Sequence, residues 1–232
     1  MKSFTKHILK NGLRIILCPM PHSMASTFLV LVEAGSKYED KDINGISHFL
    51  EHMSFKGTKK RPSALAISSE MESLGAVYNA FTGSELTGYF AKIRSDKIDN
   101  ALNIISDMYI NPLFKEKDLE KEKGVIIEEI NMYEDLPMRK VHDIFMSCLY
   151  GDQPAGWSIA GEKSNVLSIN KNKLIEYRKN HYVPEATTIV VSGNLKEKEI
   201  LKKLIKFLVL FRFLLKRKRK KRLKSRLVPK LL

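Results

Sequence analysis

Residues 45–62 read GISHFLEHMSFKGTKKRP, a stretch that contains the pattern His48-x-x-Glu51-His52. On an α-helix, residues three and four positions apart lie on the same face. We therefore expect both imidazoles and the Glu51 carboxylate to meet at one point, on a helix over residues 46–55. Two histidines at this spacing can bind one Zn²⁺, with the glutamate placed as a general base for an activated water. The pattern is the inverse of the more common HExxH arrangement.

Two histidines on the surface of an amphipathic helix are the simplest alternative. The chain has only six histidines, so the pattern would arise by chance in on the order of one in a hundred such sequences. We therefore favour a metal site. The other four histidines are isolated in the sequence, and we expect them to be structural or exposed.

A catalytic zinc ion usually has three protein ligands and one position open to water. The stretch 116–133 is expected to be a long helix, and it offers Glu122, Glu128 and Glu129. Glu122 and Glu129 are seven residues apart, so they lie on one face of that helix. One of them could bind the metal while the other supports a ligand. Spacing alone does not choose among the three glutamates.

The rest of the chain alternates between strand and helix patterns, with hairpin signals such as Asn11-Gly12. These patterns predict an α+β fold with a largely antiparallel sheet packed by helices. We expect a Gly/Pro-containing loop over residues 150–165. The expected strands are residues 4–10, 13–18, 27–33, 77–82, 86–93 and 187–192, and the further helices are residues 64–74, 96–109, 139–149 and 171–181.

The formal net charge of +14 is confined to the end of the chain. Residues 196–232 contain 16 Lys/Arg and 2 Asp/Glu, which leaves 24 of each kind in residues 1–195. A prediction about partners from charge would therefore concern the tail alone. The two cysteines, Cys18 and Cys148, do not suggest a disulfide framework. With no stretch of roughly 18 apolar residues and no signal-peptide core, we expect no transmembrane segment and a cytoplasmic location.

Six segments of the chain, in order, resemble one known family. They are LKNGLRIILCPMP (9–21), EAGSKYED (33–40), GISHFLEHMSFKGTKKRP (45–62), LGAVYNAFTGSELTGYFAKI (74–93), EKEKGVIIEEINMYEDLP (120–137) and YVPEATTIVVSGNL (182–195). The resemblance is to the pitrilysin/insulinase family of zinc metallopeptidases, which includes the mitochondrial processing peptidases. Several motifs in register make a chance match much less plausible than one motif alone.

The resemblance implies a role for particular residues. It implies that Glu129 is the third zinc ligand and that Glu122 orients the site without binding the metal. It also implies that a substrate peptide lies against an edge strand in the segment Asn79-Ala80-Phe81-Thr82, where Asn79, Ala80 and Phe81 are the expected binding residues. Addition of a peptide strand is physically reasonable there, because main-chain hydrogen bonds bind a peptide with little sequence preference.

The implied fold is one lobe of the two-lobed pitrilysin-type metallopeptidase. A second homologous lobe, on the same chain or on a homodimer or heterodimer partner, would close over the cleft. We divide the chain into a zinc metallopeptidase lobe, residues 1–205, and a basic tail, residues 206–232, which resembles nothing in the family. A frameshift or a truncated reading frame would produce such a tail, and we hold this as a hypothesis.

The function we expect is that of a zinc-dependent endopeptidase acting on peptides or unfolded segments. One alternative is a truncated zinc-binding subunit that is inactive without its second lobe. Another is a module whose basic tail binds anionic lipid or nucleic acid electrostatically. The charged run lacks interleaved aromatic residues for base stacking. We therefore expect no specific nucleic acid and favour a disordered tail without a dedicated partner.

Overall fold

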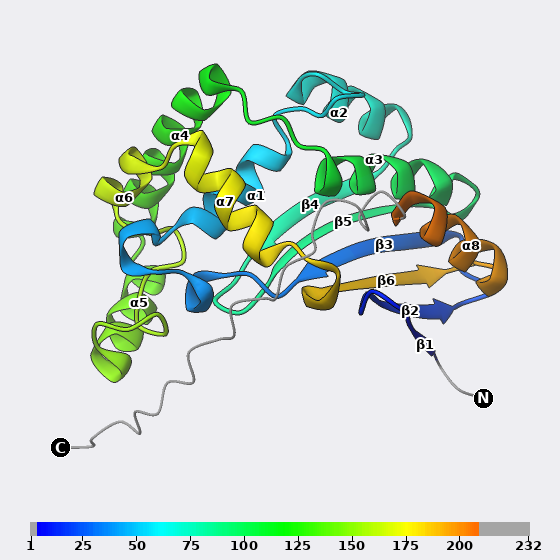
Figure 1. Ribbon diagram of the computed structural model, residues 1–232, viewed down its shortest axis with the longest axis horizontal. Helices are drawn as coiled ribbons and strands as arrows, with labels where there is room; N and C mark the ends of the chain where they lie inside the picture. The colour runs from blue at the N-terminus through cyan, green and yellow to red at the C-terminus, as the bar shows by residue number, and fades with distance from the viewer. Residues whose placement is uncertain (1–3, 209–232) are drawn as a thin grey trace.

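Six strands form one sheet in the order β1-β2-β6-β3-β5-β4 (Figure 1). The computed structural model describes residues 4–208. The strands are β1 (Thr5–Ile8), β2 (Arg14–Pro19), β3 (Ala25–Val32), β4 (Val77–Thr82), β5 (Thr87–Arg94) and β6 (Thr187–Gly193). β4 is at one edge of the sheet and β1 is at the other.

Neighbouring strands are antiparallel except for β2 and β6, which run parallel. The turn between β1 and β2 contains Gly12 at a φ of +88°, a conformation that favours glycine, as the Asn-Gly signal predicts. β4 and β5 form a second hairpin, in which Thr82 is opposite Thr87. The predicted α+β fold with a largely antiparallel sheet is confirmed.

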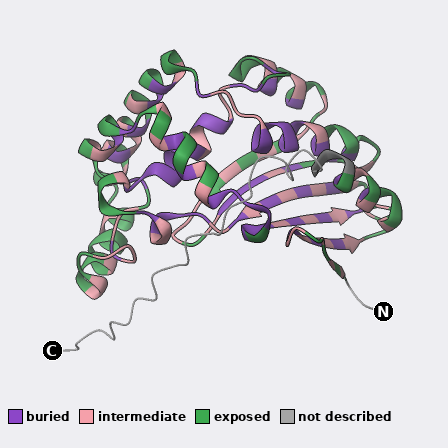
Figure 2. Ribbon diagram, in the orientation of Figure 1, coloured by how far each residue is buried: buried purple, intermediate pink, exposed green. Residues whose placement is uncertain are grey.

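Alternate residues of the central strands β3 and β6 are buried, so one face of these strands is covered (Figure 2). Phe28, Val30 and Val32 of β3 are at most 2% exposed, and Ile189 and Val191 of β6 are fully buried. This period of two is what a strand with a single buried face shows. The buried side chains of the sheet and of α1, α3 and α7 form a single hydrophobic core.

Eight helices and four short 3₁₀ turns complete the described part of the chain. The helices are α1 (Ile46–Ser54), α2 (Ala64–Ser73), α3 (Ile98–Ile110), α4 (Glu116–Glu134), α5 (Pro137–Tyr150), α6 (Lys163–Ser168), α7 (Lys171–His181) and α8 (Glu197–Leu208). The 3₁₀ turns are η1 (Ser36–Tyr38), η2 (Lys41–Ile43), η3 (Ser95–Lys97) and η4 (Pro184–Ala186).

One prediction is wrong. α6 begins within residues 150–165, which were expected to form a loop, because a six-residue helix is too short to show a helical period.

The position of α1 is what matters for the site. α1 contacts β4 on one side and α4 on the other, while α4, α5 and α6 group beyond one end of the sheet (Figure 1). The loop after α1 is attached to α2 and α3 by buried Arg61. Its guanidinium lies 2.9 Å from Asp107 Oδ2 and 2.5 Å from Glu70 Oε2. α1 therefore sits between the edge strand and the long helix α4.

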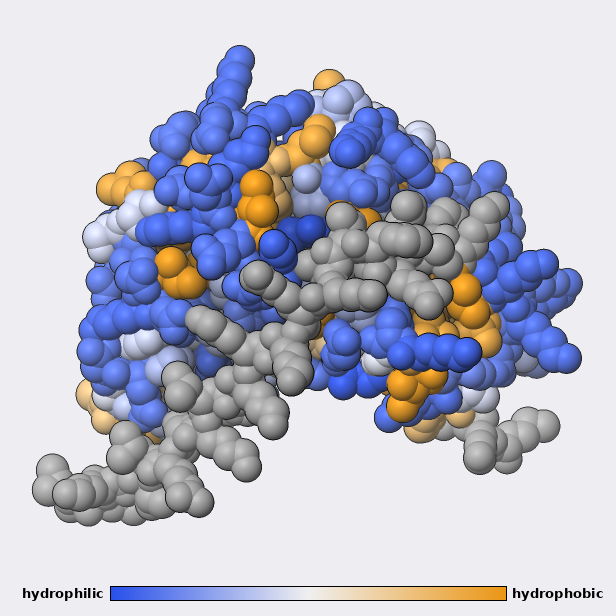
Figure 3. Space-filling view, in the orientation of Figure 1, coloured by the Kyte–Doolittle hydropathy of each residue, from blue (hydrophilic) through white to orange (hydrophobic). Residues whose placement is uncertain are grey.

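Much of the molecular surface is polar. The face shown in Figure 3 is mainly hydrophilic, with hydrophobic residues in small groups. No helix among residues 4–208 is long and apolar enough to cross a bilayer. Cys18 and Cys148 are free. Most of the basic tail lies outside the described residues, so its predicted boundary at residue 205 and its disorder stay predictions.

Candidate metal centre

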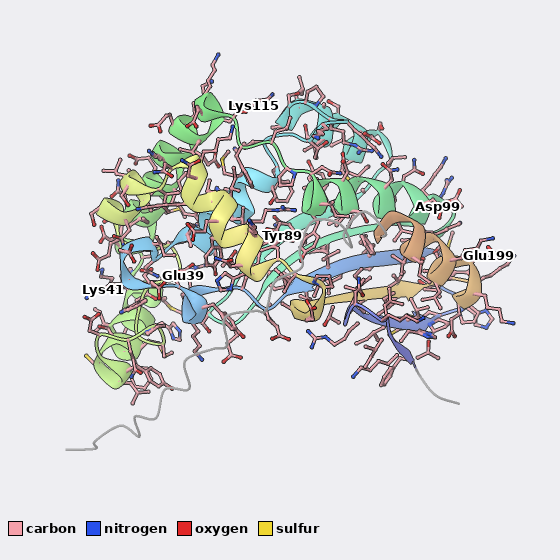
Figure 4. All side chains as sticks on the ribbon, in the orientation of Figure 1. Glu39, Lys41, Tyr89, Asp99, Lys115 and Glu199 are labelled. Atoms are coloured by element: carbon pink, nitrogen blue, oxygen red, sulfur yellow. The ribbon has the colours of Figure 1, made fainter. Side chains whose placement is uncertain are left out.

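Helix α1 begins against a buried carboxylate. Glu39 is 3% exposed, and its two oxygens each accept a hydrogen bond of 2.8 Å, from the N–H groups of Gly45 and Ser47. N–H groups at a helix start have no partner within the helix, and the helix dipole favours an anion there. Gly45 has a φ of +96°, and a Cβ there would lie 2.6 Å from the Ala160 carbonyl oxygen. Figure 4 labels Glu39 at the segment leading into α1.

Three potential ligand atoms meet between α1 and α4. His52 Nε2 lies 3.2 Å from His48 Nε2. Glu129 Oε2 lies 3.6 Å from His48 Nε2 and 3.4 Å from His52 Nε2. The two histidines share one face of α1, as their spacing predicts, and Glu129 approaches them from α4. Among residues 4–208, no other group of three such side chains is close enough to bind one metal ion.

These spacings fit Zn²⁺. Two ligands about 2.05 Å from a tetrahedral centre lie about 3.3 Å apart, and the three observed separations range from 3.2 to 3.6 Å. Two imidazole nitrogens and one carboxylate oxygen are a donor set of catalytic zinc sites, in which water takes the fourth position. The residues present therefore fit the metal that their pattern predicts.

Glu122 contacts the outer side of this cluster. His52 Nδ1 donates to Glu122 Oε1 at 2.8 Å, and Lys56 Nζ lies 2.5 Å from Glu122 Oε2. Burial would raise the pKa of Glu122, but the bonds from His52 and Lys56 lower it. An ionised Glu122 keeps a proton of His52 on Nδ1, so that Nε2 is the nitrogen available to bind a metal.

The two imidazoles have opposite pKa shifts. Burial and the neighbouring His52 lower the pKa of His48 to about 4, so this ring is neutral at pH 7. Burial also opposes the charge on His52, but its hydrogen bonds with Glu122 and Glu129 raise its pKa to about 9. A metal ion at this site would therefore displace a proton from His52, because only a neutral imidazole nitrogen is a ligand.

Glu129 is held from two sides. Its hydrogen bond with His52 lowers its pKa to about 2 in spite of burial, and a hydrogen bond from Tyr133 acts in the same direction. The Tyr133 hydroxyl donates to Oε1, which leaves Oε2 directed at the histidines. Arg139 lies over the Tyr133 ring, 4.3 Å from its centroid. The neighbouring Glu128 is exposed and accepts only a 3.4 Å bond from Asn131.

Glu51 lies between the cluster and the edge strand. It is half-buried, and burial raises its pKa against the opposing effect of a hydrogen bond from Thr82. That bond runs from the Thr82 hydroxyl to Glu51 Oε2. A carboxylate with a raised pKa beside a metal site suits a general base. The predicted base is therefore near the predicted ligands, on the side that faces β4.

The residues predicted to bind substrate lie on β4, which is the free edge of the sheet next to Glu51. Asn79 and Phe81 are exposed and Ala80 is half-buried. The Ala80 N–H donates to Asn79 Oδ1 at 2.8 Å. A peptide that adds to this edge would take that donor over from the Asn79 side chain.

Sequence reasoning did not identify Lys56, Tyr133 and Glu39 as contributors to the site, and it named Thr82 only as part of the substrate-binding segment. Lys56 is four residues after His52 and Tyr133 is four residues after Glu129, so helical spacing could have indicated both. Thr82 is 31 residues from Glu51, and no local pattern connects the two. Glu39 precedes α1 across an irregular segment, where a periodic signal does not exist.

Two family models match the chain. A family model described as "Insulinase (Peptidase family M16)" matches residues 14–163, and one described as "Peptidase M16 inactive domain" matches residues 168–227. The second match extends into the basic tail, contrary to the expectation that residues 206–232 resemble nothing in the family.

The chain belongs to the insulinase family of peptidases.

Family members with similar sequences include proteins named as proteases. The chain is 39% identical over 195 residues to "Uncharacterized zinc protease YmxG" of Bacillus subtilis, covering 84% of this chain and 47% of the relative. It is 38% identical over 196 residues to the mitochondrial-processing peptidase subunit beta of Mus musculus, covering 84% of this chain and 39% of the relative. The chain thus spans about half the length, or less, of these curated relatives.

Solved structures of proteins named as proteases share the fold. A protease from Helicobacter pylori superposes with a TM-score of 0.86 at 24% identity, over 94% of this chain and 52% of that one. The first half of the periplasmic protease PqqL from Escherichia coli gives a TM-score of 0.83 at 23% identity, over 96% of this chain and 48% of that one. At these identities the likeness establishes the fold and nothing finer.

Proposed function

We propose that this chain is the zinc-binding half of an endopeptidase that hydrolyses peptide bonds in peptides or unfolded segments. The observation that supports the proposal is the meeting of ligand atoms of His48, His52 and Glu129 within 3.2–3.6 Å of one another, with Glu51 beside them. Relatives named zinc proteases support both the metal and the reaction class.

In this proposal each side chain has one task. His48, His52 and Glu129 would bind Zn²⁺, which supplies a Lewis acid that activates water and polarises the substrate carbonyl. Glu51 accepts the proton of the attacking water and passes it to the leaving amine. Glu122 accepts the Nδ1 proton of His52 and thereby determines which nitrogen is the ligand.

The substrate would lie on β4. An extended peptide paired with Asn79, Ala80 and Phe81 would form a seventh strand at the free edge of the sheet. Such a strand would run past Glu51, because the Thr82 end of β4 contacts that carboxylate. Main-chain pairing requires an extended peptide, so we expect a preference for peptides and unfolded segments over folded proteins.

A second candidate is a zinc-binding half that turns over substrate only together with another half. The observation that favours it is length, because this chain spans 47% of its Bacillus subtilis relative. A homologous second lobe, on a longer chain or a partner subunit, would then supply the opposite wall of the cleft. The two candidates share the zinc site and differ in turnover.

Metal analysis combined with a peptidase assay distinguishes these candidates. We expect residues 1–232 to contain about one zinc per chain and to cleave a quenched, unstructured peptide. Glu51→Gln should keep the zinc and lose at least about 100-fold in kcat, because general-base catalysis typically contributes 10²–10⁴-fold. Glu128→Gln, which changes an exposed glutamate of α4, is the matched control and should behave as the wild type.

Each result has a distinct meaning. One zinc with cleavage that depends on Glu51 supports a half-molecule that is active alone. One zinc without cleavage supports the second candidate. A folded chain without zinc, or full activity in Glu51→Gln, would contradict the proposed chemistry. The cytoplasmic location and the binding properties of the tail stay predictions of the sequence.

A further inference from the structure

The hydroxyl of Thr82 is bound to the carboxylate of Glu51. Thr82 is the last residue of β4, and its hydroxyl donates its single proton to Glu51 Oε2. Among residues 4–208, Thr82 is the partner with which the Glu51 side chain forms a hydrogen bond. A hydroxyl that donates to a carboxylate forms one of the stronger kinds of hydrogen bond, because the acceptor is charged.

The end of β4 that bears Thr82 is itself anchored. Thr82 is opposite Thr87 of β5 in the hairpin, and the two hydroxyl oxygens are 3.5 Å apart. Thr87 is fully buried and donates to the Ala34 carbonyl oxygen at 3.0 Å. Because the Thr87 proton is used in that bond, Thr87 does not donate to Thr82. The Thr82 hydroxyl donates to the nearer, charged carboxylate of Glu51 in preference to the Thr87 oxygen.

A glutamate side chain has three torsions, and a base is effective only within hydrogen-bonding reach of the proton that it accepts. The Thr82 bond limits those torsions and occupies Oε2, which leaves Oε1 to accept the proton. We infer that Thr82 is the positioning residue for Glu51, connecting the base on α1 to the edge strand on which a substrate peptide would lie. This inference rests on the proposed function and adds a residue to it.

The test uses variants of the whole 232-residue chain loaded with zinc. Thr82→Val keeps the β-branched shape and removes the donor, whereas Thr82→Ser keeps the donor. Thr27→Val is the matched control, because it makes the same change on β3 away from the site. Zinc content and circular dichroism show whether each variant has folded around the metal.

The deciding measurement is the carboxyl ¹³C resonance of Glu51, assigned by its loss in Glu51→Gln. We expect Thr82→Val to shift this resonance, and Thr82→Ser and Thr27→Val to leave it in place. Where the chain is active, Thr82→Val should lower kcat by about 10–100-fold with KM changed by less than about threefold, because a small misplacement of a catalytic group has costs of this order. Thr82→Ser should restore kcat.

A Glu51 resonance in Thr82→Val that superimposes on the wild-type resonance would overturn the inference. So would a loss of kcat in Thr82→Val that Thr82→Ser does not restore. If every variant binds zinc and none cleaves peptide, the proposed activity of the isolated half fails, and the resonance still decides the role of Thr82. If Thr82→Val does not fold, Thr82→Ala is measured in the same way.

Discussion

At the scale of single residues, the site depends on which oxygen or nitrogen each side chain presents. Glu122 accepts a hydrogen bond from His52 Nδ1, Tyr133 donates one to Glu129 Oε1, and Thr82 donates one to Glu51 Oε2. His52 Nε2 and Glu129 Oε2 therefore face the proposed metal position. Contacts of this kind orient metal ligands and adjust their basicity, so their loss lowers metal affinity or activity.

The first prediction at this scale concerns Glu122. Glu122→Gln should lower zinc affinity by about 10–100-fold, because an amide replaces the anion that keeps the proton of His52 on Nδ1. Competition with a chromogenic chelator measures this affinity. Glu128→Gln is the control on the same helix and should bind zinc as the wild type does. Unchanged affinity in Glu122→Gln would show that the contact with His52 does not orient the ligand.

At the scale of elements, the site is assembled from the start of α1, one face of α4 and the end of β4. The start of α1 is determined by Glu39, which also accepts from Asn44 Nδ2 at 2.9 Å. Figure 4 shows Glu39 at the segment before α1 and Tyr89 on the sheet beneath it. A change at Glu39 should therefore move α1 as a unit, together with both histidines.

The second prediction is a pH-dependent effect of Glu39→Gln. Burial raises the pKa of Glu39 above 4.5 in the folded chain. The folded state therefore binds more protons than the unfolded state between pH 4.5 and the folded pKa, and the stability that Glu39 contributes falls as pH rises through this window. Glutamine does not titrate. The variant should be about 1–3 kcal/mol less stable near pH 5, because a buried donor loses its acceptor.

The difference in unfolding free energy between the wild type and Glu39→Gln should narrow as the pH is raised. Urea unfolding from pH 5 to pH 8, in the presence of a chelator, measures it without a contribution from metal binding. Because other titrating groups are common to both proteins, their effects cancel in the difference. A difference that widens with rising pH would show that the folded-state pKa of Glu39 is lowered and not raised.

At the scale of the whole molecule, the proposed zinc ion would connect elements that are far apart in the sequence. His48 and His52 are on α1 and Glu129 is on α4, and α2, α3 and two strands separate these helices in the chain. A ligand that binds only the folded state stabilises it by mass action. The metal should therefore affect the stability of the entire lobe.

The third prediction is a loss of thermal stability on metal removal. Zinc at about 100 times its Kd should add about 2.7 kcal/mol to the unfolding free energy. For this chain of 232 residues the change corresponds to roughly 5–10 °C in Tm. Differential scanning calorimetry with and without a chelator measures the shift. His48→Ala should show no response to either zinc or chelator, and an equal response would place the metal elsewhere.

Local periodicity accounts for what the sequence alone determined. The spacing of three and four residues placed His48, Glu51 and His52 on one face of a helix, and a spacing of seven placed Glu122 and Glu129 on another. The strand Val77–Thr82 and the helix Lys171–His181 have the bounds that were predicted. Within one element the backbone geometry repeats, so the sequence reveals which side chains share a face.

The tertiary structure decided which faces meet. It brought Glu129 rather than Glu128 to the histidines, placed Thr82 against Glu51, and inserted β6 between β2 and β3. Each of these contacts joins residues that are distant in the sequence and is determined by burial of apolar faces across the whole lobe. Local pattern contains no information about such pairings, because a helix face or a strand edge is complementary to many partners until the core is packed.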